Sequence, residues 1–561
     1  MKKKFFLFIT ALIIAAIMQK VSFAMPIDST TLVDGHYTTN ITLVNTKQYI
    51  IKGFVYMEKN TTITIQQGTI IYGDFNTKGT LIIQRGAQII ALGSPVSPIV
   101  FTSRKPAGQR ATGDWGGVIL LGRSGVNTVA GGDSAAIEGL PPEVLPAYYG
   151  GQPRNDADNS GIMRYVRIEY AGINLTGVSG NEINGLTMGG VGSGTTLEYI
   201  QVSFAGDDSF EWFGGTVNCK HLIAYKGLDD DFDSDNGYRG YNQFMLAIRD
   251  SAIADVSTSN GFEIDNNANS PNNFNNPRSQ ATYSNLTMIG PKKTLSTVIN
   301  PLFGRGAHLR RNNLTSIYNT IIMGWPTGVR FDGPGVFNAM LNDSSKFRNN
   351  ILSGYTTLGD TAGSTATANF GRTGSAFIQT SAYNNRTFTN NTEVGLANPF
   401  GFYAGTPDYR PSAGSAALTG SNFSYPNLTN PFFTNVSYVG AFDGTNDWTS
   451  GWSNWDPQNK DYTVGIIPIS TTIPSKFELS QNYPNPFNPA TKINFALPKT
   501  GFTSLKVFSV EGKEVASLVN NELTAGTYTF EFDASGLSSG IYFYTLKADN
   551  ISETKKMFLV K

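Results

Sequence analysis

The segment TTITIQQGTIIYG (61–73) is followed by GTLIIQRGAQIIALG (79–93), and the two segments share one pattern. Ile63 in the first corresponds to Leu81 in the second, and a glycine stands five residues after each. This spacing predicts a repeat of about 18 residues. A coil made of short strands and glycine turns buries its apolar side only when neighbouring coils stack on it. The two segments therefore predict a solenoid.

The composition of the 561 residues favours short strands over helices. The chain has 60 glycines and 15% charged residues, and it shows no long run of apolar residues at helical spacing. The segments SPIVFTS (97–103) and GDWGGVILLG (113–122) continue the strand pattern with longer turns. We expect an all-β chain in which residues 25–455 form the solenoid. A β-propeller is the alternative, but its blades take about 40–50 residues, which the short repeat disfavours.

The recurring L-x-I-x-x-G pattern resembles that of the right-handed parallel β-helix superfamily over roughly residues 40–445. The resemblance implies the fold of the main body, and it implies no particular activity. Stacked coils present long flat faces, which suit extended polymers.

The first residues have the layout of a cleavable signal peptide. Lys2–Lys4 precede an apolar run from Phe5 to Met18, and the small-residue segment Ser22–Ala24 follows. The run of 14 residues is shorter than the roughly 20 that a membrane-spanning helix requires. We expect residues 1–24 to be removed and the mature chain to have no transmembrane segment.

Charge, cysteine and histidine content disfavour several classes of function. The chain carries 42 basic and 42 acidic residues, so no overall positive charge attracts nucleic acid. The single cysteine, Cys219, rules out an intrachain disulfide, and we expect it to be buried. His36, His221 and His308 lie far apart and lack metal-ligand spacing, so we expect them to be surface or strand residues.

The end of the chain predicts a separate domain. Residues 456–475 lose the coil pattern and contain prolines, threonines and serines, which is typical of a linker. Apolar and polar residues then alternate in short stretches, which predicts an antiparallel, Ig-like β-sandwich over residues 476–561. The clearest alternating stretches are 506–510, 528–532 and 542–546.

This domain is similar to the C-terminal sorting domain of type IX secretion cargo. The shared features are the Asn-Pro-rich entry in 474–498, a middle divided by glycines, and the basic last strand KKMFLVK (555–561). The resemblance implies recognition by the type IX secretion machinery, export through the outer membrane, removal of the domain, and release or attachment at the cell surface. An ordinary accessory or sugar-binding module is the alternative for the same strands.

Three segments in the middle of the solenoid share a phenylalanine followed by a carboxylate. They are GDDSFEWFGG (206–215), LDDDFDSDNG (228–237) and NGFEIDNNAN (260–269), with a weaker fourth pair at Phe331-Asp332. The first three pairs are 22 and 30 residues apart, which predicts equivalent places on successive coils. Strand alternation would then point each phenylalanine inward and each carboxylate outward.

The outward carboxylates predict a metal site, because a bound cation relieves their mutual repulsion. Calcium is the natural ion, since it accepts six to eight oxygen ligands in flexible geometry. The expected ligands are Glu211, Asp231, Asp233, Asp235, Glu263 and Asp265. The segment is no EF-hand, because the glycine required at the sixth place is displaced to Gly237. Turn formation by the same Asp and Asn side chains remains the alternative.

An enzyme remains the second hypothesis. A polysaccharide hydrolase requires paired carboxylates, which Asp207, Asp208, Asp230 and Asp231 could supply. A calcium-assisted polysaccharide lyase also requires a base, and the candidates are Arg239, Arg249, Arg305 and Arg310. The motif Gly206-Asp207-Asp208 resembles the GDD of polygalacturonases, but that family's Gly-His-Gly and Arg-Ile-Lys segments are missing.

The leading hypothesis is a secreted or surface-attached binding or structural protein that engages extracellular polysaccharide. Trp448, Trp452 and Trp455 lie just before the linker, and we expect them to close the open end of the solenoid. A sugar-stacking patch is the alternative for these three rings.

Overall fold

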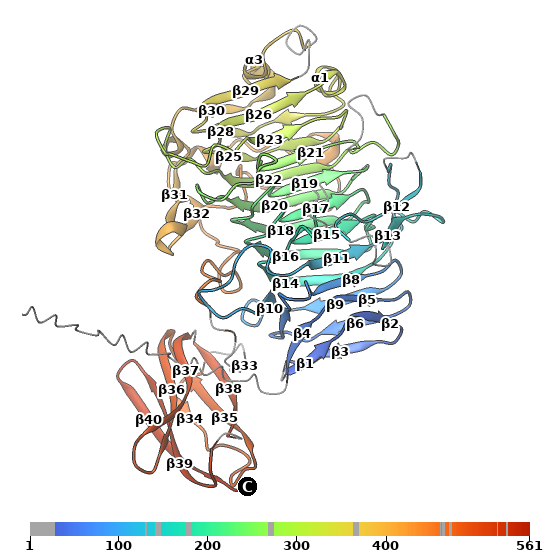
Figure 1. Cartoon of the computed structure of the whole chain (residues 1–561). Helices are drawn as coiled ribbons and strands as arrows, with labels where there is room; N and C mark the ends of the chain where they lie inside the picture. Colours follow the sequence, from blue (N-terminus) through green and yellow to red (C-terminus); the bar gives the residue numbers. More distant parts are fainter. Residues whose placement is uncertain are drawn as a thin grey trace, which may run out of the picture.

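The computed structural model describes residues 29–45, 47–128, 132–140, 147–175, 182–267, 274–362, 370–460, 462, 466–470, 474–523, 525–534 and 537–561. The predicted signal peptide (1–24) lies outside the described residues. Parallel strands stack along one axis to form a β-helix, and a smaller antiparallel domain follows it (Figure 1). The predicted all-β fold is confirmed. Of the helices described, none is long and apolar enough to cross a membrane.

One face of the β-helix is a parallel sheet with a single strand from each coil. Its eleven strands are β2 (Gly35–Tyr37), β5 (Phe54–Met57), β8 (Thr80–Ile83), β11 (Gly117–Leu121), β15 (Leu186–Gly189), β17 (Phe210–Phe213), β19 (Phe232–Asp235), β21 (Phe262–Ile264), β23 (Arg305–Leu309), β26 (Thr327–Asp332) and β29 (Thr357–Ala362). We call it the eleven-stranded sheet.

The other faces form a sheet of seventeen strands. These are β1 (Ser29–Leu32), β3 (Ile41–Leu43), β4 (Gln48–Ile51), β6 (Thr62–Ile65), β7 (Ile70–Gly73), β9 (Gln88–Leu92), β10 (Ile99–Ser103), β14 (Gly161–Glu169), β16 (Thr196–Ser203), β18 (Asn218–Tyr225), β20 (Tyr241–Ile248), β22 (Thr282–Ile289), β24 (Ser316–Tyr318), β25 (Ile321–Met323), β27 (Phe347–Arg348), β28 (Ile351–Ser353) and β30 (Arg386–Phe388).

The long strands β14, β16, β18, β20 and β22 turn a corner of the solenoid at one residue each. That residue has a positive φ of 53–59°, and the ladder register skips it between neighbouring coils. The corner residues on successive coils are Tyr165, Tyr199, His221, Phe244 and Asn285. In later coils the corner separates two strands, with Asn319 between β24 and β25 and Asn349 between β27 and β28.

The predicted repeat of about 18 residues is wrong. Ile63 in β6 pairs with Ile89 in β9, which is 26 residues further on, whereas Leu81 lies in β8 of the other sheet. Each coil contributes strands to both sheets, and alternating apolar residues followed by a glycine turn occur in strands of either sheet. The 18-residue spacing therefore links neighbouring faces, and one coil is longer.

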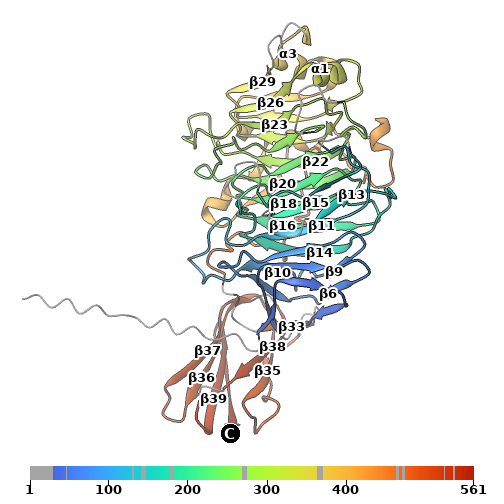
Figure 2. The same cartoon turned by 45° about the vertical axis from the view of Figure 1, so that its right-hand side comes forward.

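The core runs through the interior of the solenoid and is closed at its C-terminal end by short helices. α1 (Pro334–Leu341) and α3 (Gly374–Ile378) lie beyond the last coils (Figures 1 and 2). Phe337 of α1 and Phe377 of α3 pack around Phe370, with ring centroids 4.9 Å apart in both pairs. These aromatic side chains shield the last coil from water.

After β30 the chain turns back along the outside of the solenoid. We call residues 389–460 and Tyr462 the return segment; it contains β31 (Leu396–Asn398), β32 (Asp408–Pro411) and four 3₁₀ turns, Asn391–Val394, Gly401–Ala404, Ala416–Leu418 and Pro426–Leu428. A fifth 3₁₀ turn, Ser381–Tyr383, precedes β30.

The contacts of the return segment move steadily toward earlier coils. The backbone N–H of Asn422 donates to Asn319 Oδ1 at 2.8 Å, and that of Asn454 donates to Gln201 Oε1 at 2.8 Å. The Tyr462 hydroxyl donates to the buried carboxylate of Glu169 at 2.6 Å. The return segment thus fastens late coils to early ones.

The expectation that Trp448, Trp452 and Trp455 close the open end of the solenoid is wrong. Trp452 is 1% exposed and meets the corner residues Tyr165 and Tyr199 edge-on, with centroids 5.9 and 6.0 Å apart. The return segment places the three rings against the side of the solenoid, in one apolar cluster.

The C-terminal domain consists of two antiparallel four-stranded sheets around their own core. One sheet contains β33 (Ile466–Ser470), β34 (Glu478–Leu479), β35 (Ala490–Leu497) and β38 (Gly526–Asp533). The other contains β36 (Gly501–Ser509), β37 (Glu514–Leu523), β39 (Gly540–Ala548) and β40 (Ile551–Leu559).

The stretch expected to be a linker, 456–475, has structure at both ends. Tyr462 is buried against Ile50, Tyr72 and Val100 of the first coils. β33 pairs with β38 of the C-terminal domain. We infer that the connection between the two domains is short and begins after Tyr462.

Candidate functional site

Outward side chains of the eleven-stranded sheet form a single row along the solenoid axis, which we call the outer row. In coil order its members are His36, Tyr56, Ile82, Ile119, Thr187, Glu211, Asp233, Glu263, His308, Arg330 and Asp360. The chemistry changes along the row from aromatic and apolar, through three acids, to histidine and arginine. The acidic middle is the candidate site.

The alternation predicted for the three phenylalanine-carboxylate pairs is confirmed. Phe210, Phe232 and Phe262 occupy the same position on successive coils, and each is fully buried in the core. Their ring centroids are 5.8 and 5.6 Å apart from one coil to the next. Each following carboxylate therefore points to the outside of the sheet.

The carboxylates gather in three overlapping groups in which the oxygen atoms lie within 4.8 Å of one another. The groups are Asp207, Asp208 and Asp229; Asp208, Glu211 and Asp233; and Asp230, Asp233 and Glu263. Asp208 belongs to the first two groups and Asp233 to the last two. We call these seven residues the acidic centre; it is continuous across three coils.

Burial and mutual repulsion disfavour ionisation of the acidic centre. Burial, followed by the charges of Asp207 and Asp233, raises the pKa of Asp208 well above its ordinary value. Burial and then Glu263 do the same to the pKa of Asp233, and burial raises the pKa of Asp229 to about 6. A nearby loop adds Glu138, whose pKa burial and then Asp235 raise to about 8.

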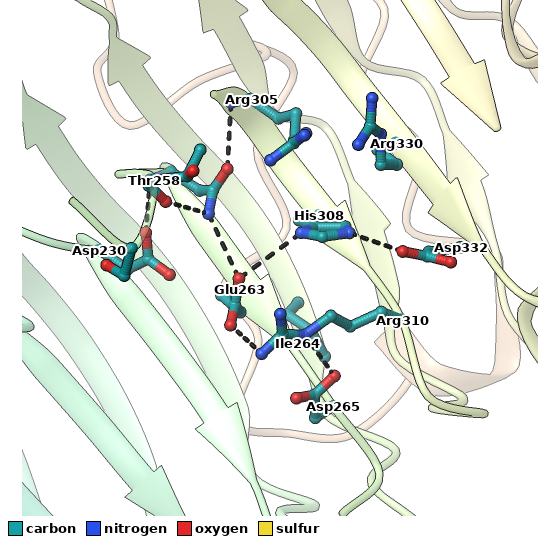
Figure 3. Close-up of polar contacts among 12 residues, drawn as sticks. Asp230, Thr258, Glu263, Ile264, Asp265, Arg305, His308, Arg310, Arg330 and Asp332 are labelled. Atoms are coloured by element: carbon teal, nitrogen blue, oxygen red, sulfur yellow. Dashed lines mark hydrogen bonds and ion pairs between the residues drawn. The ribbon is translucent and has the colours of Figure 1, made fainter. Parts of the chain in front are cut away.

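The last acid of the outer row is neutralised by basic neighbours (Figure 3). Arg310 forms ion pairs with Glu263 and, at 2.8 Å, with Asp265. His308 lies between Glu263 and Asp332, with nitrogen–oxygen distances of 3.5 and 3.1 Å. Burial alone would raise the pKa of Glu263, but the bond to His308 and the charge of Arg310 hold it below its ordinary value.

The middle of the acidic centre lacks such neighbours. Within the described ranges, Asp208, Glu211 and Asp233 form no ion pair. The amide of Asn184 donates to Glu211, but Asn184 Oδ1 has no hydrogen-bond partner among the described residues, and neither has the hydroxyl of Thr187. Both side chains are at most 2% exposed, so two oxygen atoms are buried beside Glu211 without a donor.

Three of the six expected metal ligands lie outside the acidic centre. Asp231 precedes β19, so strand alternation does not apply to it, and it forms a fully buried ion pair with Arg249 at 3.1 Å. Its predicted place on the face of Asp233 is therefore wrong. Asp265 is paired with Arg310 and Arg311. Asp235 accepts the backbone N–H of Asn236 at 2.5 Å, and burial followed by the charge of Asp265 raises its pKa to about 7.

The fourth pair, Phe331-Asp332, is not an equivalent of the first three. Phe331 pairs with Leu309, so Arg330 occupies the outer row and Asp332 lies two positions further along β26. Asp332 contacts the row only through His308.

Sequence patterns did not indicate several of these residues as ligands. Asp207, Asp208 and Asp230 were expected only as a hydrolase pair, and the position of Asp208 one coil before Asp230 was the available signal. Glu138, Asn184 and Thr187 share no motif with the three segments, because a loop and an earlier coil provide them.

The four arginines proposed as bases have different environments. Arg249 is buried with Asp231, Arg310 is paired with Glu263 and Asp265, and Arg239 is paired with Asp156 at 3.1 Å. Arg305 lies in β23 beside the outer row, and its guanidinium has no ion pair within the described ranges (Figure 3).

Cys219 and His221 are distant from this chemistry. Cys219 is buried in the core, and burial raises its pKa to about 12. His221 stacks between Tyr199 and Phe244 at a corner of the solenoid, and burial lowers its pKa to about 3. Neither residue has the environment of a nucleophile or base.

The fold and the C-terminal domain together define an exported β-helix protein. The model of the pectate-lyase-like beta helix domain matches residues 35–398, and the chain belongs to that family. The model of the secretion system C-terminal sorting domain matches residues 481–561. The protein is therefore a cargo of the type IX secretion machinery and is secreted or located on the outer cell surface.

No curated protein matches the chain. Among solved structures, the chain is similar to tailspike protein 2 of Escherichia coli O157:H7 bacteriophage CAB120, with 11% identity and a TM-score of 0.24. That match covers 91% of this chain and 64% of the tailspike chain.

Proposed function

We propose that this secreted protein binds an extracellular polysaccharide through calcium held at the acidic centre. The observation that carries the proposal is the group formed by Asp208, Glu211 and Asp233, whose oxygens lie within 4.8 Å of one another without an ion pair among the described residues. Two unit charges about 5 Å apart repel by about 3 kcal/mol at an effective dielectric constant of 20. A hard divalent cation with oxygen ligands reverses that cost.

The surroundings of the acidic centre support a polymeric anionic ligand. The outer row continues past the acids to His308 and Arg330, so acidic and basic groups alternate along an axis that a chain of sugars can follow. Asp233 and Glu263 are only partly buried, and calcium held there keeps coordination positions for carboxylates of the ligand. Membership of the pectate-lyase-like family and export to the cell surface favour the same class of ligand.

Affinity electrophoresis tests the proposal. Residues 25–561 should migrate more slowly in gels that contain polygalacturonate or alginate with calcium, and at the ordinary rate in chelator or in neutral xylan. The double variant Glu211→Gln, Asp233→Asn should lose the retardation, whereas the exposed control Asp133→Asn should keep it. Equal migration with and without calcium in every polymer would contradict the proposal.

A calcium-dependent polysaccharide lyase is the second candidate function, and Arg305 favours it. A lyase requires a base next to the metal, and burial followed by the charge of Arg330 lowers the pKa of Arg305. Arg305 is also the candidate base without an ion pair among the described residues.

Product formation separates the two functions. A lyase should release unsaturated sugars from an acidic polymer in calcium, and Arg305→Lys should abolish release while calcium-dependent retardation persists. A binding protein should release none under the same conditions.

A further inference from the structure

The acidic centre contains more negative charge than one divalent cation can balance. Six of its carboxylates, all except Glu263, form no ion pair with any residue that the structure describes. One calcium ion would leave four of these six charges uncompensated in a buried site, which is costly. The excess requires further cations or protons.

The arrangement of the carboxylates matches two adjacent cations with one shared ligand. Asp208 belongs both to the group with Asp207 and Asp229 and to the group with Glu211 and Asp233. A carboxylate has two oxygens and can therefore bind two ions at once. The backbone N–H of Asp230 donates to Asp208 Oδ1 at 2.8 Å, which fixes the orientation of this carboxylate.

Neutral oxygens independently point to a ligand at these positions. Asn184 Oδ1 and Thr187 Oγ1, beside Glu211, are buried without a hydrogen-bond donor from the described residues, and Asp229 Oδ1 is likewise buried without one. Buried acceptors without donors are rare, because each loses its bonds to water. Thr187 precedes Glu211 in the outer row, so its hydroxyl faces the same side of the sheet.

The third group is less suited to an ion. Its member Glu263 already contacts Arg310 and His308, and Asp230 accepts the backbone N–H of Asn260. Positive charge next to Glu263 disfavours a second cation there.

We propose that the acidic centre binds two calcium ions bridged by Asp208, one with Asp207 and Asp229 and the other with Glu211 and Asp233. This inference rests on the proposed calcium site, and it adds the stoichiometry and the bridging residue. Asn184 and Thr187 supply neutral oxygens to the second ion.

Equilibrium dialysis of residues 25–561 against calcium tests the pair. Wild-type protein should bind two ions, Asp229→Asn or Glu211→Gln should bind one, and Asp208→Asn should bind none. Glu263→Gln should still bind two, because its carboxylate is already neutralised. Circular dichroism spectra identical to the wild type show that each variant is folded.

A stoichiometry of one in the wild type, or retention of one ion by Asp208→Asn, would overturn the bridged pair. The first result is compatible with calcium-dependent retardation by acidic polymers, so the pair can fail while the proposed function stands. A wild-type stoichiometry of zero would overturn both.

Discussion

Glu211 and Asp233 lie directly opposite each other on adjacent coils, in register between β17 and β19, and point to the same side of the sheet. Together with Asp208 they bring three carboxylates within 4.8 Å in a buried site. The fold thus forces like charges together at a point where the core beneath is entirely apolar. Such an arrangement is stable only with protons or cations, and the predictions below distinguish these states.

The first prediction concerns pH in the absence of calcium. Folding raises the pKa of several acids here, to about 8 for Glu138 and about 7 for Asp235, so the folded chain holds more protons than the unfolded chain above about pH 4. Stability in chelator should therefore be highest near pH 5 and fall as pH rises to about 8. Melting curves across this range measure it.

Calcium should reverse this trend, because ion binding requires carboxylates and its contribution grows as they ionise. The melting temperature gained on adding calcium should be larger at pH 8 than at pH 5. A gain that is equal at both values would contradict metal binding by these acids.

The second prediction concerns the buried pair of Asp231 and Arg249. Replacing Arg249 by methionine leaves Asp231 buried without a partner, and the cost should be about 3–5 kcal/mol of unfolding free energy. The double variant Asp231→Leu, Arg249→Met should recover most of it, since no charge remains buried. Denaturant unfolding of both variants measures the difference. Equal losses would show that the cost comes from packing.

The third prediction concerns the return segment. Trp452→Ala removes a fully buried ring between the segment and the corner residues, and should cost about 3–5 kcal/mol. Limited proteolysis should then cut within residues 389–460, while β-helix strands remain protected. The exposed Tyr403→Ala serves as a control and should leave the digestion pattern unchanged.

The fourth prediction concerns export. Deleting residues 466–561 removes all strands of the sorting domain, including β33, which pairs with β38. In a host with the type IX machinery, the truncated protein should accumulate in the periplasm. The full-length Asp133→Asn chain is the matched control and should reach the surface. Undiminished surface exposure after the deletion would contradict the assignment.

Strand alternation made part of this structure predictable. A phenylalanine followed by an acid at one-coil spacing was enough to place Phe210, Phe232 and Phe262 inside and their neighbours outside. The same rule failed for Asp231, because it precedes the strand and a distant arginine, Arg249, determines its orientation.

Other features depend on contacts between distant residues. The repeat was misread because strands on different faces of one coil look alike in sequence. Nothing local to Trp452 indicates that the chain turns back toward the early coils, since its partners lie more than 250 residues away. Asn184 and Thr187 became visible only when an earlier coil brought them beside Glu211.

The most direct test of the central claim is a crystal structure of residues 25–561 grown with calcium, with anomalous differences measured. The account predicts calcium peaks with oxygen atoms of Asp208, Glu211 and Asp233 at about 2.3–2.6 Å. Carboxylates in direct short hydrogen bonds to one another, with no calcium peak at a saturating concentration, would show that protons balance the acidic centre and would contradict the account.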